Sequence, residues 1–291
     1  FMKWGSLTVL ITNPRDMPGF IKELRAWKWS VLTGVNTLFN GLLNTPGFDR
    51  LDFSSVKVVV GGGAAVQKTV ADRWQKLTGH FVTEAYGLTE ASPGVCANPL
   101  TTPWNGSIGM PFPSTDVTIR NDDFAELPAW TGEGVIEACT GELCVRGPQV
   151  MKGYWNNPEE TAKVMQDGWL KTGDVGYMSA EGRFTITDRK KDMILVSGFN
   201  VYPNEIESVV MAHPGVLECG AVGVPDEKSG EAVKVVIVKK DPDLTKDSVI
   251  LHCKTQLTGY KLPRHVEFRD TLPKTPIGKI LRRELRDPPK P

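Results

Sequence analysis

Residues 56–90 read VKVVVGGGAAVQKTVADRWQKLTGHFVTEAYGLTE and decide the architecture of the first part of the chain. A short β-branched run at 56–60 is typical of a buried strand, and it leads into three successive glycines at 61–63. Residues 66–77 have the apolar spacing of an amphipathic helix, and a second strand starts within 81–87. The helix stripe consists of Val66, Val70, Trp74 and Leu77. This strand–loop–helix–strand order predicts an α/β fold.

The pattern changes from about residue 106, where strand-like alternation is interrupted by Gly and Pro. Alternation at 116–120 and 142–146 predicts two strands of a small β-rich subdomain near 106–188. The stretch between these strands, 121–140, is largely polar and contains two glycines. We expect it to be an exposed loop.

The last hundred residues alternate helical and strand patterns, which predicts a small α+β domain of common size. The predicted helices are 204–212, 246–257 and 279–286, and the predicted strands are 217–224 and 232–239.

The overall composition is that of an ordinary soluble globular protein. Lys plus Arg and Asp plus Glu both number 34, and this zero net charge argues against nucleic acid as the main partner. The five cysteines form no C-x-x-C pair, so a disulfide framework or zinc site is not expected and a reducing cytoplasm fits best. We expect all of them to be small apolar groups in or near the core: Cys96, Cys139, Cys144, Cys219 and Cys253. No apolar run approaches the length of a membrane span.

The first chemical signal is YGLTE at 86–90, preceded by Glu84-Ala85. An aromatic ring can stack on a purine, a hydroxyl can bind a phosphate, and a carboxylate can hold Mg²⁺. The alternative is a helix start, with Thr89 and Glu90 in its first turn, and for an isolated motif this alternative is favoured.

The second signal is WLKTGD at 169–174. An Asp at a strand edge can accept both hydroxyls of a ribose. An Asx-type turn explains a Gly-Asp pair equally simply, and for an isolated match the turn is favoured.

The third and fourth signals combine charge with glycine. DRKKDMI at 188–194, followed by VSGFN at 196–200, is either a solvated charge run or a place where Gly lets a cofactor approach the backbone. PKTPIGK at 273–279 is a bent loop from which Lys279 could stabilise charge on a phosphate. A surface lysine beside Arg282-Arg283 is the simpler reading of that loop taken alone.

The triple glycine at 61–63 is not a phosphate loop, because no G-x-x-x-x-G-K-[ST] pattern follows it. We interpret it as a close approach of backbone to a ligand.

Taken in order, the four signals resemble the adenylate-forming superfamily of acyl-CoA synthetases, luciferases and peptide-synthetase adenylation domains. The run 167–174 looks like the signature of fatty acyl-CoA synthetases, and 188–207 is especially similar to bacterial long-chain fatty acid–CoA ligases. The resemblance implies that 1–190 is the C-terminal part of a large adenylation domain. It implies that 191–291 is a small mobile C-terminal domain.

The resemblance also implies roles for individual residues. Nucleotide-binding roles fall on Gly62, Gly63, Ala64, Glu84, Ala85, Tyr86, Asp174, Ile186 and Arg189. Tyr86 would stack on adenine and Asp174 would hold the ribose. Catalytic roles fall on Lys279, Thr89 at the α-phosphate and Glu90, which would bind Mg²⁺. Lys191 would be the hinge, Ser197 and Gly198 would contact coenzyme A, and Val35 and Phe39 would line the acyl pocket.

The implied reaction is the ATP-dependent activation of a fatty acid, of the long-chain type, to acyl-AMP and its transfer to coenzyme A. Alternatives are an adenylation domain that loads a carrier protein and a non-catalytic nucleotide- or CoA-binding fragment. The family's Gly/Ser/Thr-rich phosphate loop is absent and the chain opens with Phe1, so we expect the second half of an enzyme, inactive by itself. Segment 122–140 departs from the family pattern and is expected to be a surface insertion. A cytoplasmic location is expected, with peripheral contact at the inner membrane and the oligomeric state left open.

Overall fold

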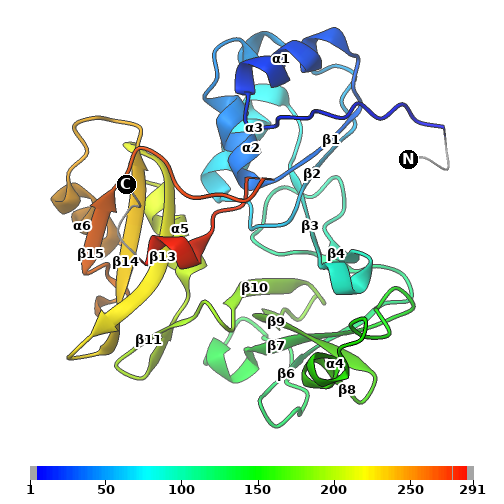
Figure 1. Cartoon of the computed structure of the whole chain (residues 1–291), viewed down its shortest axis with the longest axis vertical. Helices are drawn as coiled ribbons and strands as arrows, with labels where there is room; N and C mark the ends of the chain where they lie inside the picture. The colour runs from blue at the N-terminus through cyan, green and yellow to red at the C-terminus, as the bar shows by residue number, and fades with distance from the viewer. Residues whose placement is uncertain (1–4, 277, 287–291) are drawn as a thin grey trace.

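The computed structural model describes residues 5–276 and 278–286, and its strands form three five-stranded sheets (Figure 1). The sheets follow one another along the chain. In Figure 1 the first lies with its helices at the top, the second lies below it, and the third stands at the left. Among the described residues, no helix is both long and apolar enough to cross a membrane.

The first sheet confirms the predicted α/β architecture. Its order is β1-β2-β3-β4-β5, with β1, β2 and β3 parallel and the last two strands antiparallel. The strands are β1 (Val31–Gly34), β2 (Val58–Gly61), β3 (Thr83–Gly87), β4 (Gly94–Ala97) and β5 (Met110–Pro111). The helices are α1 (Met17–Ala26), α2 (Asn36–Leu43) and α3 (Lys68–Thr78), with short 3-10 turns η2 (Phe48–Arg50) and η3 (Thr89–Ala91).

The core of this first unit is aromatic. Trp74 on α3 is fully buried, and its ring lies 5.0 Å from the Phe39 ring and 5.2 Å from the Phe48 ring. The predicted helix stripe is right except at its end, where Leu77 is 37% exposed and Thr78 is buried instead. Residues spaced by four from Val66 share one face of the helix, and this face includes position 78 rather than 77. The buried Thr78 hydroxyl has a hydrogen-bond partner, because it donates to the Trp74 carbonyl oxygen.

The second sheet is antiparallel, in the order β10-β9-β7-β6 with β8 paired to β9. Its strands are β6 (Asp116–Arg120), β7 (Gly141–Arg146), β8 (Met165–Gln166), β9 (Trp169–Met178) and β10 (Phe184–Arg189). The two predicted strands are therefore confirmed, and helix α4 (Pro158–Val164) was not predicted. The loop 121–140 is largely exposed, carries the turn η4 (Ile136–Cys139), and is fixed where Trp130 packs edge-on against Tyr177.

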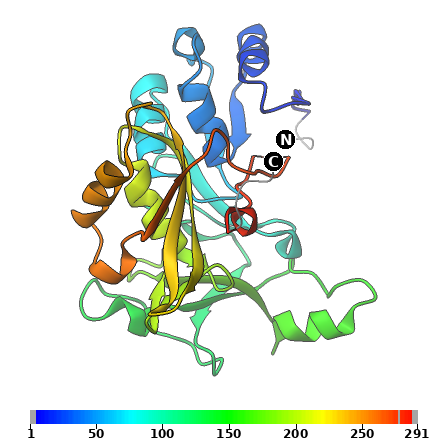
Figure 2. The ribbon, with the colours of Figure 1, turned by 60° about the vertical axis from the view of Figure 1, so that its left-hand side comes forward.

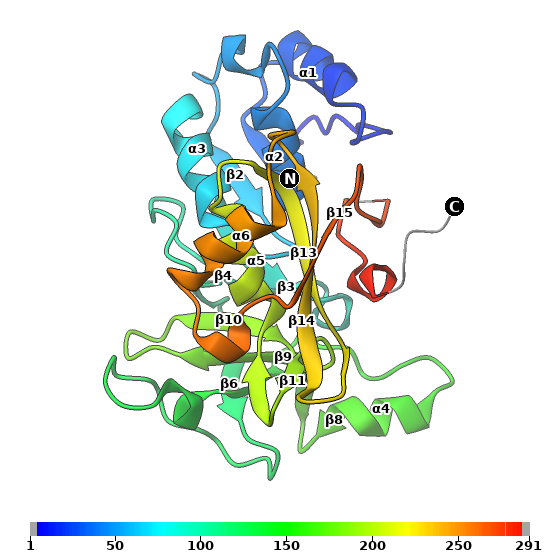
Figure 3. The same cartoon turned by 90° about the vertical axis from the view of Figure 1, so that its left-hand side faces the viewer.

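The third sheet has the order β12-β11-β14-β13, and β15 adds to β14 in parallel. Its strands are β11 (Ile194–Val196), β12 (Phe199–Val201), β13 (Val216–Asp226), β14 (Gly230–Lys239) and β15 (His265–Phe268). Helices α5 (Pro203–Met211) and α6 (Lys246–Lys254) cover the same face, as Figure 3 shows, and the turn η5 (Gly259–Lys261) follows α6.

The predicted helix at 279–286 is wrong. Only the 3-10 turn η6 (Arg282–Leu285) forms there, because Ile280 is tied to Lys274 in a β-bridge and the preceding residues belong to a tight loop. Leu285 is fully buried on the face of β13 and β14 opposite the helices, where Gly220 leaves room for it. The helix predicted at 246–257 is real but ends at Lys254.

All five cysteines are free. Four are buried as expected, whereas Cys139 in the exposed loop is only half-buried.

The third unit stands against the first through polar contacts. Asn40 on α2 donates through Nδ2 to the Leu217 carbonyl oxygen (2.8 Å), and the Thr37 hydroxyl donates to the Gly278 carbonyl oxygen (2.8 Å). Arg15 donates to the Thr275 carbonyl oxygen (2.6 Å). Figure 2 shows the turn η6 near the centre of the molecule, and the contacts of Thr37 and Arg15 hold the loop that precedes η6 against the first unit.

Candidate functional site

A cavity of about 470 Å³ opens where the three units meet. The loop after β2, strand β3, residues of β9, β10 and β13, helices α2 and α5, and the loop after residue 273 all contribute to its wall. The predicted site residues that line it are Val35, Gly63, Ala64, Glu84, Ala85, Tyr86, Asp174, Ile186, Arg189, Lys191 and Lys279. Residues up to 244 positions apart in sequence therefore share one cavity.

Tyr86, Asp174 and Arg189 form one hydrogen-bonded group on this wall. Tyr86 lies at the end of β3, and its hydroxyl donates to Asp174 Oδ2 (2.5 Å). Arg189, at the end of β10, places Nε 3.3 Å from Asp174 Oδ1. Burial and the neighbouring Asp174 carboxylate raise the pKa of Tyr86 above its usual value, so the phenol stays protonated and acts as a donor. The group presents an aromatic face beside a carboxylate and a guanidinium.

Lys279 enters the cavity from a tight loop. Its backbone N–H donates to the Thr275 hydroxyl (3.1 Å) and its carbonyl oxygen accepts from the Thr275 N–H (2.8 Å). Ile277 within this loop lies outside the described residues. Within the part of the chain that the structure describes, Lys279 Nζ has no carboxylate within 4.0 Å. Burial, Arg189 and Arg282 lower the pKa of Lys279, against the influence of Asp174. A half-buried ammonium of this kind is well placed for an anionic ligand.

Glu84 is the buried acid of the cavity wall. It lies on β3 with 9% of its surface exposed, and Oε1 accepts a hydrogen bond from the Val66 N–H (2.9 Å). Burial raises the pKa of Glu84 to about 7, although the Val66 hydrogen bond opposes that change. The loop after β2 lies beside Glu84 in the cavity wall. It contains Gly63, whose φ of +75° is a backbone conformation that favours glycine.

Glu90 lines a second cavity of about 280 Å³, whose wall also includes Tyr154, whereas the predicted residue Thr89 is exposed and belongs to neither cavity wall. Glu90 Oε1 accepts a hydrogen bond from the Tyr154 hydroxyl (2.8 Å). In the described ranges, no cluster of three or more His, Cys, Asp or Glu residues could hold a metal by itself. The single half-exposed carboxylate does fit Mg²⁺, which proteins often hold by one or two carboxylates together with substrate phosphates.

Some predicted residues lie away from the main cavity. Phe39 is fully buried in the core against Trp74, so its ring is not open to the cavity. Gly62 follows β2, and its N–H donates to the Gly34 carbonyl oxygen (3.0 Å), but it is not part of the cavity wall. Ser197 and Gly198 form the exposed turn between β11 and β12.

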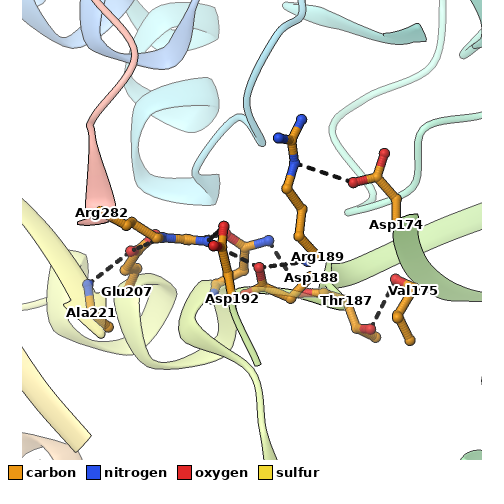
Figure 4. Close-up of polar contacts among 10 residues, drawn as sticks. Asp174, Val175, Thr187, Asp188, Arg189, Asp192, Glu207, Ala221 and Arg282 are labelled. Atoms are coloured by element: carbon orange, nitrogen blue, oxygen red, sulfur yellow. Dashed lines mark hydrogen bonds and ion pairs between the residues drawn. The ribbon is translucent and has the colours of Figure 1, made fainter. Parts of the chain in front are cut away.

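An ionic cluster in the wall of this cavity, with Asp188 at its buried centre, was missed by sequence reasoning (Figure 4). Arg282 binds Asp188, Asn204 and Glu207, while Asp192 lies 3.6 Å away. From the sequence alone, Arg282 is expected in a basic surface segment and Asp188 in a charge run. The three basic residues flanked by two aspartates in 188–192 are the available signal, but nothing local in the sequence connects them with residue 282.

Two family models match the chain. A model of the AMP-binding enzyme family covers residues 1–155, and a model of the AMP-binding enzyme C-terminal domain covers residues 205–279.

Curated relatives match nearly the whole chain. It is 57% identical over 288 residues to the long-chain-fatty-acid–CoA ligase of Escherichia coli O6:H1, covering 99% of this chain and 50% of that protein. It is 44% identical over 270 residues to the long-chain-fatty-acid–CoA ligase of Bacillus subtilis, covering 91% and 46%. The chain thus spans about half the length of the curated relatives it matches.

Solved structures also match. Anthranilate CoA ligase AuaEII in complex with anthranoyl-AMP superposes with a TM-score of 0.88 at 27% identity, covering 97% of this chain and 54% of that one. ATP-bound MatB from Rhodopseudomonas palustris gives 0.82 at 33% identity, over 93% and 52%. Apo MatB gives only 0.68 at the same identity, over 93% and 53%. Because the first family model alone spans more than half of the 291 residues, the chain belongs to the AMP-binding enzyme family.

Proposed function

We propose that this chain is the C-terminal half of a long-chain fatty acid–CoA ligase, which makes acyl-CoA, AMP and pyrophosphate from a fatty acid, ATP and coenzyme A. The observation that carries the proposal is the Lys279 ammonium, which lies half-buried in a cavity beside the Tyr86–Asp174–Arg189 group. This arrangement suits an anionic nucleotide that offers a purine and a ribose. The choice of fatty acid rests on the names of relatives that are up to 57% identical.

The proposed reaction has two steps. A carboxylate oxygen of the fatty acid attacks the α-phosphorus of ATP, the bond to the β-phosphate breaks, and pyrophosphate leaves. The deprotonated thiol of coenzyme A then attacks the acyl carbon, and AMP leaves with the electron pair of the broken C–O bond. Negative charge accumulates around the α-phosphorus in the first step, where a cation is most effective.

We infer the following roles for the chain's own residues. The Tyr86 ring stacks on adenine, and Asp174 accepts hydrogen bonds from the ribose hydroxyls, with Arg189 holding that carboxylate in place. Lys279 pairs with the carboxylate of the fatty acid and the α-phosphate during the first step. The Thr89 hydroxyl donates to the α-phosphate, and Glu90, held by Tyr154, binds Mg²⁺, which would neutralise phosphate charge.

The second step requires a different arrangement of the third unit, the small unit that follows residue 191. Ser197 and Gly198, the proposed coenzyme A contacts, lie in the exposed β11–β12 turn and not on the cavity wall, which Lys279 occupies instead. A rotation of the small unit about Lys191 would withdraw Lys279 from the cavity and bring the β11–β12 turn with Gly198 into it. In support, the chain superposes better on ATP-bound MatB than on apo MatB, with TM-scores of 0.82 and 0.68, so MatB itself adopts distinct arrangements.

The proposal includes a cytoplasmic location, where ATP and coenzyme A are available, with peripheral contact at the inner membrane as the source of the lipid substrate. Neither a nucleic-acid partner nor a particular oligomeric state is part of it.

A panel of fatty acids of increasing chain length tests the function in the full-length enzyme that contains this chain. We expect AMP release that requires both coenzyme A and a long-chain acid, with acyl-CoA as the product. Release of pyrophosphate without any acyl-CoA would instead indicate an adenylation domain that loads a carrier protein. Nucleotide binding without turnover would indicate a binding module.

A further inference from the structure

The buried cluster around Arg282 connects the loop of Lys279 to both sides of residue 191. Arg282 lies three positions after Lys279, and its guanidinium makes four hydrogen bonds (Figure 4). Nε and Nη2 donate to the two carboxylate oxygens of Glu207 (2.9 and 2.7 Å). Nη1 donates to Asp188 Oδ1 (2.9 Å) and Nη2 also donates to Asn204 Oδ1 (2.5 Å). All three nitrogens of the Arg282 guanidinium are thus engaged, through four of its five N–H groups.

Asp188 is the most deeply buried acid in this cluster, with 1% of its surface exposed. Besides Arg282, its carboxylate accepts from the Arg189 N–H (2.7 Å) and from the Asn204 N–H (2.8 Å) at the start of α5. Water cannot replace these partners while the site is closed, so Asp188 depends on them.

The contacts of the cluster divide into two classes at Lys191. Arg282, Asn204 and Glu207 all follow residue 191, so the bonds of Arg282 to Asn204 and Glu207 lie within the small unit. Asp188 precedes residue 191, so its bonds to Arg282 and to the Asn204 N–H cross that point. A third crossing bond runs from Asn204 Nδ2 to the Thr187 carbonyl oxygen (3.1 Å).

We propose that Asp188 is a positioning residue for the adenylation step, acting as a latch across the turning point at Lys191. Its carboxylate holds Arg282 and the first turn of α5 against the end of β10, and Arg282 in turn fixes the loop that presents Lys279 to the cavity. A turn of the small unit breaks the crossing bonds but leaves the Arg282–Glu207 pair intact. The inference rests on the proposed function, because it assigns the latch to one of two half-reactions.

Asp188→Asn and Asp192→Asn are a matched pair of variants. Both replace a carboxylate near Arg282 by an amide of the same shape, but Asp188 lies before residue 191 and Asp192 lies after it, 3.6 Å from Nη1. In the full-length enzyme, we expect Asp188→Asn to slow acyl-AMP formation by about tenfold, the scale for weakening one hydrogen bond to a charged group. Thioester formation from supplied acyl-AMP should be unchanged or faster. Asp192→Asn should change both half-reactions less, and equally.

Hydrogen exchange supplies a readout that does not depend on turnover. Opening of the latch should release the contacts of Thr37 with Gly278 and of Arg15 with Thr275. The loop then loses the support of Arg15 and Thr37, so its internal bonds from the Thr275 and Gly278 amides should open more often, and these amides should exchange faster in Asp188→Asn than in wild type, and not in Asp192→Asn. Asn204→Ala removes a crossing bond while keeping the Asp188 charge, and it should shift exchange the same way if Asp188→Asn folds poorly.

The outcomes separate the latch from the function. If Asp188→Asn shows faster loop exchange but the wild type has no ligase activity, the latch is supported and the proposed function is wrong. Ligase activity in the wild type, with equal losses in both half-reactions or no change in loop exchange for Asp188→Asn and Asn204→Ala, would overturn the latch alone.

Discussion

Glu84 provides a quantitative test of the cavity's electrostatics, because its charge is buried without a cationic partner among the residues that the structure describes. Replacement by Gln keeps the shape of the side chain and an oxygen that can accept from the Val66 N–H, but removes the ionisation. Any difference between the two proteins that changes with pH therefore reports on the carboxyl group of Glu84.

The sign follows from the pKa, which burial raises from 4.5 to about 7 in the folded protein. The folded state binds the proton more tightly than the unfolded state, so the stability associated with protonated Glu84 is complete below about pH 4.5 and is lost as the pH rises to about 7. A shift of this size corresponds to about 3 kcal/mol, since one pKa unit equals about 1.4 kcal/mol. We expect Glu84→Gln to stabilise the protein by about 2–3 kcal/mol at pH 8 and to be nearly neutral at pH 5.

Urea unfolding of wild type and Glu84→Gln at pH 5 and pH 8 measures this difference. Fluorescence is a suitable probe, because Trp74 is fully buried in the same unit as Glu84. All other titrating groups are common to the two proteins and cancel in the comparison. The same difference at both pH values would refute the reasoning, since Glu84 would then keep an ordinary pKa in the folded state.

Three further predictions concern the site. Lys279→Ala in the full-length enzyme should slow acyl-AMP formation by about 10²–10³-fold, the scale for losing one preorganised electrostatic donor, with much less effect on thioester formation from supplied acyl-AMP; equal loss in both half-reactions would argue against the role. Tyr86→Ala should weaken ATP binding by roughly 1 kcal/mol through lost stacking, measurable by calorimetry, and an unchanged affinity would make Tyr86 a structural aromatic only. The 291-residue chain by itself should not release pyrophosphate from ATP and a fatty acid, because it spans about half the length of its relatives, and turnover by the purified chain would contradict this.

The strands that the sequence predicts best are those in which apolar and polar residues alternate along the sequence. The alternation at 116–120 gave β6 with its bounds correct, and the alternation at 142–146 gave all but one residue of β7. Strand β9 was not predicted, although it has ten residues, because its sequence WLKTGDVGYM contains two glycines and shows no regular alternation of apolar and polar residues. Periodicity reveals a strand only where that alternation is present.

The site follows a similar division between local and tertiary information. Local motifs identify Tyr86, Asp174, Arg189 and Lys279 one at a time. For each motif taken alone, a purely structural explanation is favoured over a functional one. The structure joins the first three by direct contacts and places the fourth in the same cavity. The bond between Asp188 and Arg282 spans 94 positions in sequence, and no local pattern encodes it.

The mobility proposed for the small unit has a physical basis in how the apolar residues are distributed. In the described part of the chain, the buried apolar clusters of the small unit contain only residues beyond 190, and the clusters of the other two units contain none of them. The contacts between the small unit and the rest, such as Thr37 with Gly278 and Asn40 with Leu217, are hydrogen bonds that water can replace. Separating the units therefore exposes little apolar core, and relative motion is the expectation for such an interface. Buried charge at Asp188 then has a clear role, because a polar interface without a core needs a directional contact to favour one arrangement.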